Sequence, residues 1–170
     1  MEKRLKRIDP GKININVFRL IEDDWFLLTA GNLKNWNTMT AGWGGFGYLW
    51  ERPVAFGFVR PQRHTFLFTE RFGHFTFSFF DRKYKKALQY CGSHSGRDGD
   101  KAKETGLVPA ATKLGNVYFQ QARLALECRK IYWQDIDPSH FLDLGLGKIY
   151  PKHDYHRMYV GEIIGCLARQ

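Results

Sequence analysis

Two short stretches of this sequence combine basic, hydroxyl and small residues in a way that suits an anion. The first, Arg60-Pro-Gln-Arg-His-Thr65, is predicted to open a helix, because proline is tolerated in a first helical turn. Free N–H groups at a helix start attract phosphate, and Arg63 and Thr65 would add a guanidinium and a hydroxyl. The alternative is an ordinary solvated helix start with surface arginines.

The second stretch, Gly92-Ser-His-Ser-Gly-Arg-Asp-Gly-Asp-Lys101, is rich in small residues and carries two cations. Exposed N–H groups in such a loop, together with Arg97 and Lys101, also suit a phosphate. Asp98 and Asp100 do not make it a calcium loop, since the twelve-position pattern with a terminal glutamate is missing. By itself the stretch is more typical of a flexible surface loop.

A glycine-rich motif, Gly42-Trp-Gly-Gly-Phe-Gly47, matches the dinucleotide pattern G-x-G-x-x-G. That pattern requires a helix to open inside the motif. The chain continues instead through Tyr48-Leu-Trp-Glu-Arg-Pro53, which has no helical periodicity. We therefore interpret the motif as a glycine-rich bend between strands, where a flat ligand could approach the backbone.

Two histidines and an aspartate in His153-Asp-Tyr-His156 could ligate iron or zinc. No third firm ligand accompanies them, so we predict no metal site there and expect these histidines to cap a strand or meet the edge of a ligand. No catalytic triad or carboxylate pair can be assigned from the sequence.

The elements that must position these residues are mostly strands, because two-residue alternation recurs more clearly than helical periodicity. The predicted strands are Trp25–Ala30, Thr38–Trp43, Val54–Val59, Phe75–Phe80, one bent strand or a pair within Val117–Trp133, and Met158–Leu167. The predicted helices are Gln62–Phe72, Lys83–Tyr90 and Asp100–Gly106, the last with Gly106 as its C-cap. Many strands and few helices favour a closed antiparallel barrel with helices outside it.

Length and composition indicate one globular domain over residues 1–170, with Met1–Lys12 as a basic N-terminal extension. Aromatic residues make up 16% and the net charge is +9, which suits polyanions such as nucleic acid, acidic lipid or a phosphorylated small molecule. No targeting segment or membrane span is recognisable, and three widely spaced cysteines argue against disulfides. We expect a cytoplasmic protein without a membrane partner.

Three ordered motifs together resemble the flavin reductase-like family, and its flavoredoxin branch most closely. They are Trp36-Asn-Thr-Met-Thr-Ala-Gly-Trp-Gly44, Val59-Arg-Pro-Gln-Arg-His-Thr65 and Ser95-Gly-Arg-Asp-Gly-Asp-Lys101. The spacing to Tyr155-His156 and Tyr159-Val-Gly-Glu-Ile163 is similar too, so the resemblance covers about Asp24 to Leu167. It implies a mainly β, antiparallel Greek-key split barrel with a few peripheral helices, FMN as cofactor, and a homodimer with the flavin near the subunit interface.

The resemblance also assigns residues to parts of the cofactor. Around the isoalloxazine and ribityl chain it implies Asn37, Thr38, Met39, Thr40 and Trp43. At the phosphate it implies Arg63 and Thr65, with Arg97 and Lys101 in a loop that closes over the cofactor. His156 is implied near the ring, and His140 is a weaker candidate for the same position.

The leading hypothesis is an FMN-binding oxidoreductase, either an NAD(P)H-dependent flavin reductase or a flavoredoxin-like electron carrier. It demands no catalytic acid or base, because hydride moves directly between cofactors. The rival is a basic aromatic barrel that binds single-stranded nucleic acid, which is disfavoured because no recognised motif accompanies the charge. A non-catalytic flavin-binding protein is the third possibility. The choice between NADH and NADPH and the electron acceptor stay open.

Overall fold

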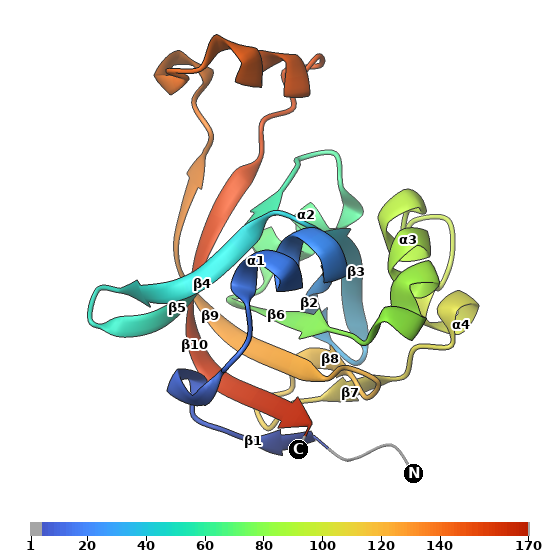
Figure 1. The fold of residues 1–170 in the computed structure, drawn as a ribbon. Helices are drawn as coiled ribbons and strands as arrows, with labels where there is room; N and C mark the ends of the chain where they lie inside the picture. The colour runs from blue at the N-terminus through green and yellow to red at the C-terminus, as the bar shows by residue number, and fades with distance from the viewer. Residues whose placement is uncertain (1–4, 170) are drawn as a thin grey trace.

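The computed structural model describes residues 5–169, which form one antiparallel sheet with short helices around it (Figure 1). Seven strands are hydrogen-bonded in the order β3-β2-β6-β9-β10-β5-β4, and β1 pairs with the far part of β10. Their bounds are β1 Leu5–Arg7, β2 Phe26–Asn32, β3 Asn35–Ala41, β4 Gly44–Leu49, β5 Arg52–Val59, β6 His74–Phe79, β9 Leu124–Asp135 and β10 Arg157–Arg169. A separate small ribbon joins β7 (Pro109–Ala111) to β8 (Val117–Phe119).

The barrel is split rather than closed. Within the described residues, β3 and β4 are the two ends of the hydrogen-bonded path, although only Gly42 and Trp43 separate them in the chain. The expectation of a closed barrel from alternation was therefore wrong, whereas the split barrel implied by the resemblance is confirmed. Alternation reports which strands exist, but not whether the first and last of them pair.

The helices flank this sheet. They are α1 (Val17–Arg19), α2 (His64–Arg71), α3 (Lys85–Ser93) and α4 (Lys101–Thr105), with a π-helical turn over Leu20–Asp24. α2 begins two residues later than expected, because Pro61 and Gln62 form a turn in which Arg63 N–H donates to the Arg60 carbonyl at 3.0 Å. α4 ends as predicted, since Gly106 has the left-handed φ of 69° that favours a glycine C-cap.

Two strands differ from their sequence-based predictions. The expected bend over Gly42–Gly47 is mostly strand, because β4 begins at Gly44 and pairs with β5 along its whole length. Gly44 has a φ of 151°, and a Cβ there would lie 2.5 Å from the Phe56 carbonyl, so only glycine allows this close pairing. Within Val117–Trp133 the two strands do not pair with each other: β8 pairs with β7, and β9 pairs with β6 and β10.

The core lies inside the curved sheet and consists largely of aromatic rings. Phe26, Phe75, Phe77 and Phe79 come from adjacent strands β2 and β6, are fully buried and contact one another. Burying a side chain of this size contributes about 1.5–3 kcal/mol. A second cluster packs α3 and α4 against the other face of β2 through Leu27, Leu88 and Ala102. This packing holds α2 and α3 close to β3, where the candidate site lies.

The N-terminal segment is partly a strand rather than a free extension. Leu5, Lys6 and Arg7 pair with the last residues of β10, and Ile8 N–H donates to the Cys166 carbonyl at 2.9 Å. The first four residues of the predicted Met1–Lys12 extension lie outside the described residues. The pairing was missed because its partner strand lies at the opposite end of the sequence.

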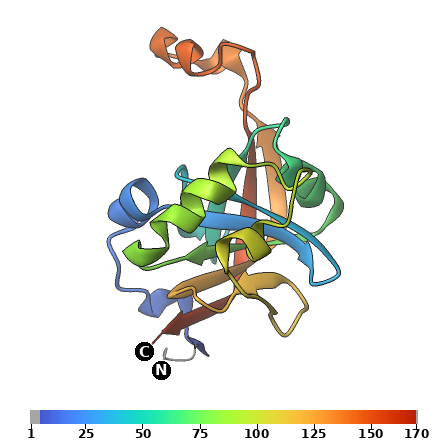
Figure 2. The ribbon, with the colours of Figure 1, turned by 90° about the vertical axis from the view of Figure 1, so that its right-hand side faces the viewer.

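A long arm joins β9 to β10 and stands away from the barrel (orange in Figures 1 and 2). It contains two short helical turns, Pro138–His140 and Leu144–Ile149. Leu142 is 100% exposed and Leu144 87% exposed, so the arm presents apolar side chains to solvent. Among residues 5–169, no helix combines the length and apolar character needed to span a membrane.

Candidate functional site

A cavity of about 470 Å³ lies beside the split, where β3, the start of α2, the loop after α3 and the base of the arm meet. It gathers residues from all the sequence motifs that resemble the flavin reductase-like family. Of the predicted site residues, those that line it are Asn37, Met39, Thr40, Trp43, Arg63, Thr65, Arg97, Lys101 and His156.

One end of the cavity is formed by the start of α2. Arg63 is the N-cap residue, and its side chain makes no capping hydrogen bond, so the first N–H groups of the helix have no side-chain acceptor there. The Asn37 amide donates to the Thr65 hydroxyl at 2.8 Å, which leaves the hydroxyl proton free to donate. Arg63 Nη1 donates to the Gly92 carbonyl at 2.7 Å and ties the start of α2 to the last turn of α3.

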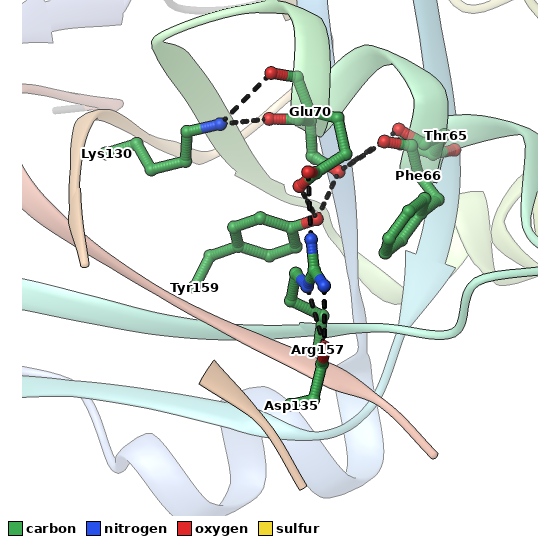
Figure 3. Close-up of polar contacts among 8 residues, drawn as sticks. Thr65, Phe66, Glu70, Lys130, Asp135, Arg157 and Tyr159 are labelled. Atoms are coloured by element: carbon green, nitrogen blue, oxygen red, sulfur yellow. Dashed lines mark hydrogen bonds and ion pairs between the residues drawn. The ribbon is translucent and has the colours of Figure 1, made fainter. Parts of the chain in front are cut away.

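The other end of α2 is fastened to the barrel (Figure 3). Lys130 Nζ on β9 donates to the terminal helix carbonyls of Thr69 and Glu70. The buried Tyr159 hydroxyl on β10 donates to Glu70 Oε1 at 2.7 Å and accepts from the Thr69 hydroxyl at 3.1 Å. A cation at a helix C-terminus is favourable. These contacts therefore fix the helix whose opposite end faces the cavity.

The loop that carries Arg97 passes very close to β3. A Cβ at Gly96 would lie 1.9 Å from Asn37 Oδ1, so a larger residue would push the loop away from the strand. Arg97 N–H donates to the Ser95 hydroxyl at 3.2 Å, and its guanidinium is 3.5 Å from the Gln62 carbonyl. The loop thus brings Arg97 to the same end of the cavity as Arg63.

Lys101 is a buried cation at this end. Its Nζ donates to the carbonyls of Thr38 and Cys91, both at 2.8 Å, and so links β3 to α3. The pKa of Lys101 is lowered to about 8, mainly by burial; Cys91 opposes this shift and the nearby Arg63 charge adds to it. Together with Arg63, Arg97 and the helix start, Lys101 makes this end suited to an anion.

The opposite end is aromatic. The indole of Trp43 is 47% exposed and packs on the ring of His156, with centroids 4.9 Å apart. The Tyr150 hydroxyl lies 2.9 Å from His156 Nδ1. Burial, and then the charge of Arg60, lower the pKa of His156 to about 4, so the ring is neutral near pH 7. Phe58 closes this end, with its ring centroid 6.4 Å from that of His156.

Two predicted residues are placed elsewhere. The Thr38 side chain is outside the cavity lining, because its hydroxyl is 2.8 Å from the Thr29 hydroxyl, on the face of β2 and β3 that packs against α3 and α4. His140 lies in the first helical turn of the arm and does not line the cavity, whereas His156 does. Among residues 5–169, no group of three His, Cys, Asp or Glu side chains could hold a metal ion.

Sequence reasoning missed several lining residues. Arg60 lines the cavity and forms an ion pair with Asp154 at 2.8 Å, 94 residues away, for which the sequence gives no signal. His64 also lines it, and its Nδ1 is buried without a hydrogen-bond partner among the described residues. Burial and the charge of Arg97 lower the pKa of His64. Its position inside the Arg60–Thr65 motif was the available signal.

The cavity of this split barrel has a cationic end and an aromatic end, which suit a small molecule with an anionic part and a flat part. The family model described as flavin reductase like domain matches residues 21–170. The chain therefore belongs to the flavin reductase-like family.

Solved structures show the same fold. An FMN-binding domain of a flavin reductase-like enzyme from Shewanella baltica superimposes with a TM-score of 0.71 at 17% identity, over 99% of this chain and 79% of that one. Flavoredoxin from Methanosarcina acetivorans gives 0.68 at 24% identity, over 96% and 77%. The NADH:FAD oxidoreductase SgcE6 from Streptomyces globisporus gives 0.66 at 17% identity, over 86% and 75%. A search among curated proteins finds no significant match.

Proposed function

We propose that the protein binds FMN in this cavity and acts as a flavin-dependent oxidoreductase. The observation that carries the proposal is that one cavity has a cationic end and an aromatic end. FMN presents a phosphate dianion and a flat ring system, which these two ends match. Family membership and the names of the structural neighbours, which include an FMN-binding domain and a flavoredoxin, support the same ligand.

The residues present fit the cofactor. The phosphate would be held by Arg63, Thr65 and the start of α2, with Arg97 closing from the loop and Lys101 behind them. The close approach of Gly96 to Asn37 keeps that loop against β3, where the ribityl chain would pass. Trp43 and His156 would meet the ring, with Met39 at the cavity wall.

Bound flavin would supply the hydride or electron transfer. The chain's own residues bind and orient it. If the Tyr150 hydroxyl donates to His156 Nδ1, the proton of this neutral ring is on Nε2, where it can donate into the cavity. No residue needs to act as acid or base for hydride transfer, so we assign none.

The binding proposal is tested by titrating the purified protein with FMN and with riboflavin. Charge-assisted hydrogen bonds contribute about 1.5–3 kcal/mol, so Arg63→Ala should weaken FMN binding roughly tenfold or more. Riboflavin lacks the phosphate and should be unaffected by Arg63→Ala. Arg71→Ala, at the exposed far end of α2, is the matched control and should change neither affinity.

Equal loss of both ligands would show that Arg63 does not contact the phosphate. A colourless protein that binds neither flavin but binds an oligonucleotide with a steep salt dependence would favour the nucleic-acid hypothesis instead.

The reaction partner divides the proposal into two versions, a reductase that uses NADH or NADPH and a carrier that exchanges electrons with another redox protein. One structural neighbour is named as an NADH:FAD oxidoreductase and another as a flavoredoxin, so both versions have precedent in this fold. Steady-state oxidation of NADH and NADPH with added FMN separates them. Turnover with either nucleotide supports the reductase, and tight FMN binding without turnover supports the carrier.

We also propose that the protein is a cytoplasmic homodimer. The three cysteines are buried and free, as is usual in a reducing compartment. The arm exposes Leu142 and Leu144 to solvent, and its base carries Tyr150 beside His156 in the cavity wall. A second copy that covers the arm would therefore stand next to the flavin site.

A further inference from the structure

Trp25 has a backbone conformation that costs free energy. Its φ is 63° and its ψ is 174°, a combination that side chains disfavour and glycine adopts readily. The other non-glycine residues with positive φ in the described chain are Trp50 and Glu51 in the β4–β5 turn and His153 in the arm. Trp25 instead directly precedes β2, a central strand. Strain of this kind persists only where the surroundings enforce it.

The indole of Trp25 is held from two sides. Lys85 Nζ lies 3.2 Å from the ring centroid and also donates to the Asp23 carbonyl. The pyrrole edge of the ring contacts Gly42, because a Cβ at Gly42 would lie 3.0 Å from Trp25 Cδ1 and 3.2 Å from Nε1. The backbone between β3 and β4 therefore rests directly on this side chain.

The two residues that Trp25 contacts, Gly42 and Lys85, belong to elements that form the cavity. Gly42 and Trp43 line its aromatic end, where Trp43 packs on His156. Lys85 is the first residue of α3, and the last turn of that helix supplies the carbonyls that accept from Lys101 and Arg63. Trp25 itself is outside the cavity lining. A single strained residue thus touches the supports of both ends of the site.

We propose that Trp25 is a positioning residue: its indole holds in place the Gly42–Trp43 segment that lines the aromatic end of the cavity, and its contact with Lys85 fixes the start of α3. The strained backbone is the conformation that directs the ring toward Gly42. This inference rests on the proposed flavin site, but it concerns residues that do not touch the ligand.

The test compares two tryptophans with positive φ, Trp25 and Trp50. Trp25→Gly should raise the dissociation constant of FMN about tenfold and reduce the quenching of flavin fluorescence, because the ring support moves. Trp50→Gly removes an exposed indole at the distant hairpin turn and should leave both quantities within about twofold of wild type. Trp25→Phe, which keeps a ring under Lys85, should recover part of the affinity.

The backbone strain at Trp25 is tested separately, by thermal unfolding. Trp25→Gly and Trp25→Ala both lack the indole, but only alanine retains the steric cost of the backbone. The glycine variant should therefore melt about 2–5 °C above the alanine variant, while the two variants bind FMN equally weakly. Equal melting temperatures would contradict the strain.

A double-mutant cycle tests the contact itself. Gly42→Ala places a Cβ against the indole and should weaken FMN binding, and the smaller ring of Trp25→Phe should make room for it. The double variant should bind at least about threefold more tightly than the two separate losses predict. Additive losses, or an unchanged dissociation constant in Trp25→Gly, would overturn the inference. A wild-type protein that binds no flavin would instead overturn the proposed function on which it rests.

Discussion

At the scale of single residues, the number of hydrogen bonds that Lys101 can donate depends on its protonation state. This dependence links ligand binding to pH. A neutral amine has two N–H donors, and the carbonyls of Thr38 and Cys91 accept both. Protonation adds a third donor, and Lys101 lines the cavity, so an anion bound there can accept it. The lowered pKa of about 8 means that burial works against this protonation in the free protein. A bound phosphate would stabilise the ammonium form and raise the pKa again.

FMN binding should therefore take up a proton above about pH 8, and the affinity for FMN should fall as the pH rises through the lowered pKa of Lys101. Lys101→Met removes this contribution. The ratio of the variant's dissociation constant to that of wild type should be largest at about pH 7 and shrink toward one at high pH. His156 stays neutral across this range, because its pKa is lowered to about 4. A fluorescence titration at each pH gives the ratio, and a ratio that does not change with pH would contradict this role of Lys101.

At the scale of elements, α2 is short and depends on its anchors. An isolated helix of eight residues is not stable in water, so tertiary contacts must hold it. The group around Glu70 does this from β9 and β10, through Lys130, Arg157 and Tyr159 (Figure 3). Arg157 also binds Asp135 with two hydrogen bonds of 2.7 and 2.8 Å, and Asp135 is the last residue of β9, at the base of the arm. The anion-binding end of the cavity is thus braced by the strands beneath it.

Tyr159→Phe should lower the free energy of unfolding by about 1–3 kcal/mol, since it removes the hydrogen bond that the buried hydroxyl donates to the Glu70 carboxylate. The Thr69 hydroxyl keeps the Phe66 carbonyl as its acceptor, at 2.9 Å. The matched control is Tyr132→Phe on the same sheet. The hydroxyl of Tyr132 bonds Gln134 at the exposed surface, so its loss should cost less than about 0.5 kcal/mol. Urea unfolding of the three proteins measures the difference. Equal stability of both variants would show that the Tyr159 hydroxyl does not anchor α2.

The sequence predicted the central strands because their alternation is local. Its three ordered motifs contain most of the predicted residues that line the cavity. What it missed depends on distant partners. β1 forms by pairing with β10, which lies at the other end of the sequence. Arg60 forms an ion pair with Asp154 at the base of the arm. The strain at Trp25 is likewise invisible in the sequence, since nothing in the residues around it indicates a φ that glycine would favour. The split of the barrel follows from closure geometry rather than from periodicity.

At the scale of the whole molecule, the packing within a single copy does not explain why the arm exposes apolar side chains. It stands clear of the barrel in both ribbon views (Figures 1 and 2). Two of its residues, Leu142 and Leu144, are strongly exposed. Exposed apolar side chains that gather on one projection are typical of an interface. The arm returns to the barrel at Tyr150 and His156, and His156 lines the cavity. A partner molecule that packs on the arm would therefore also lie close to the cavity.

The homodimer proposal therefore predicts that association and FMN binding are linked. A ligand that binds the paired state more tightly shifts the equilibrium toward that state by mass action. Sedimentation velocity over a dilution series should show dimers that persist to lower concentration when FMN is present. The double variant Leu142→Ser/Leu144→Ser should dissociate at higher concentration and bind FMN more weakly, whereas Leu114→Ser, exposed in the β7–β8 turn, should behave like wild type. A monomer that keeps its full affinity for FMN at the lowest concentrations would rule out a site completed by the second copy.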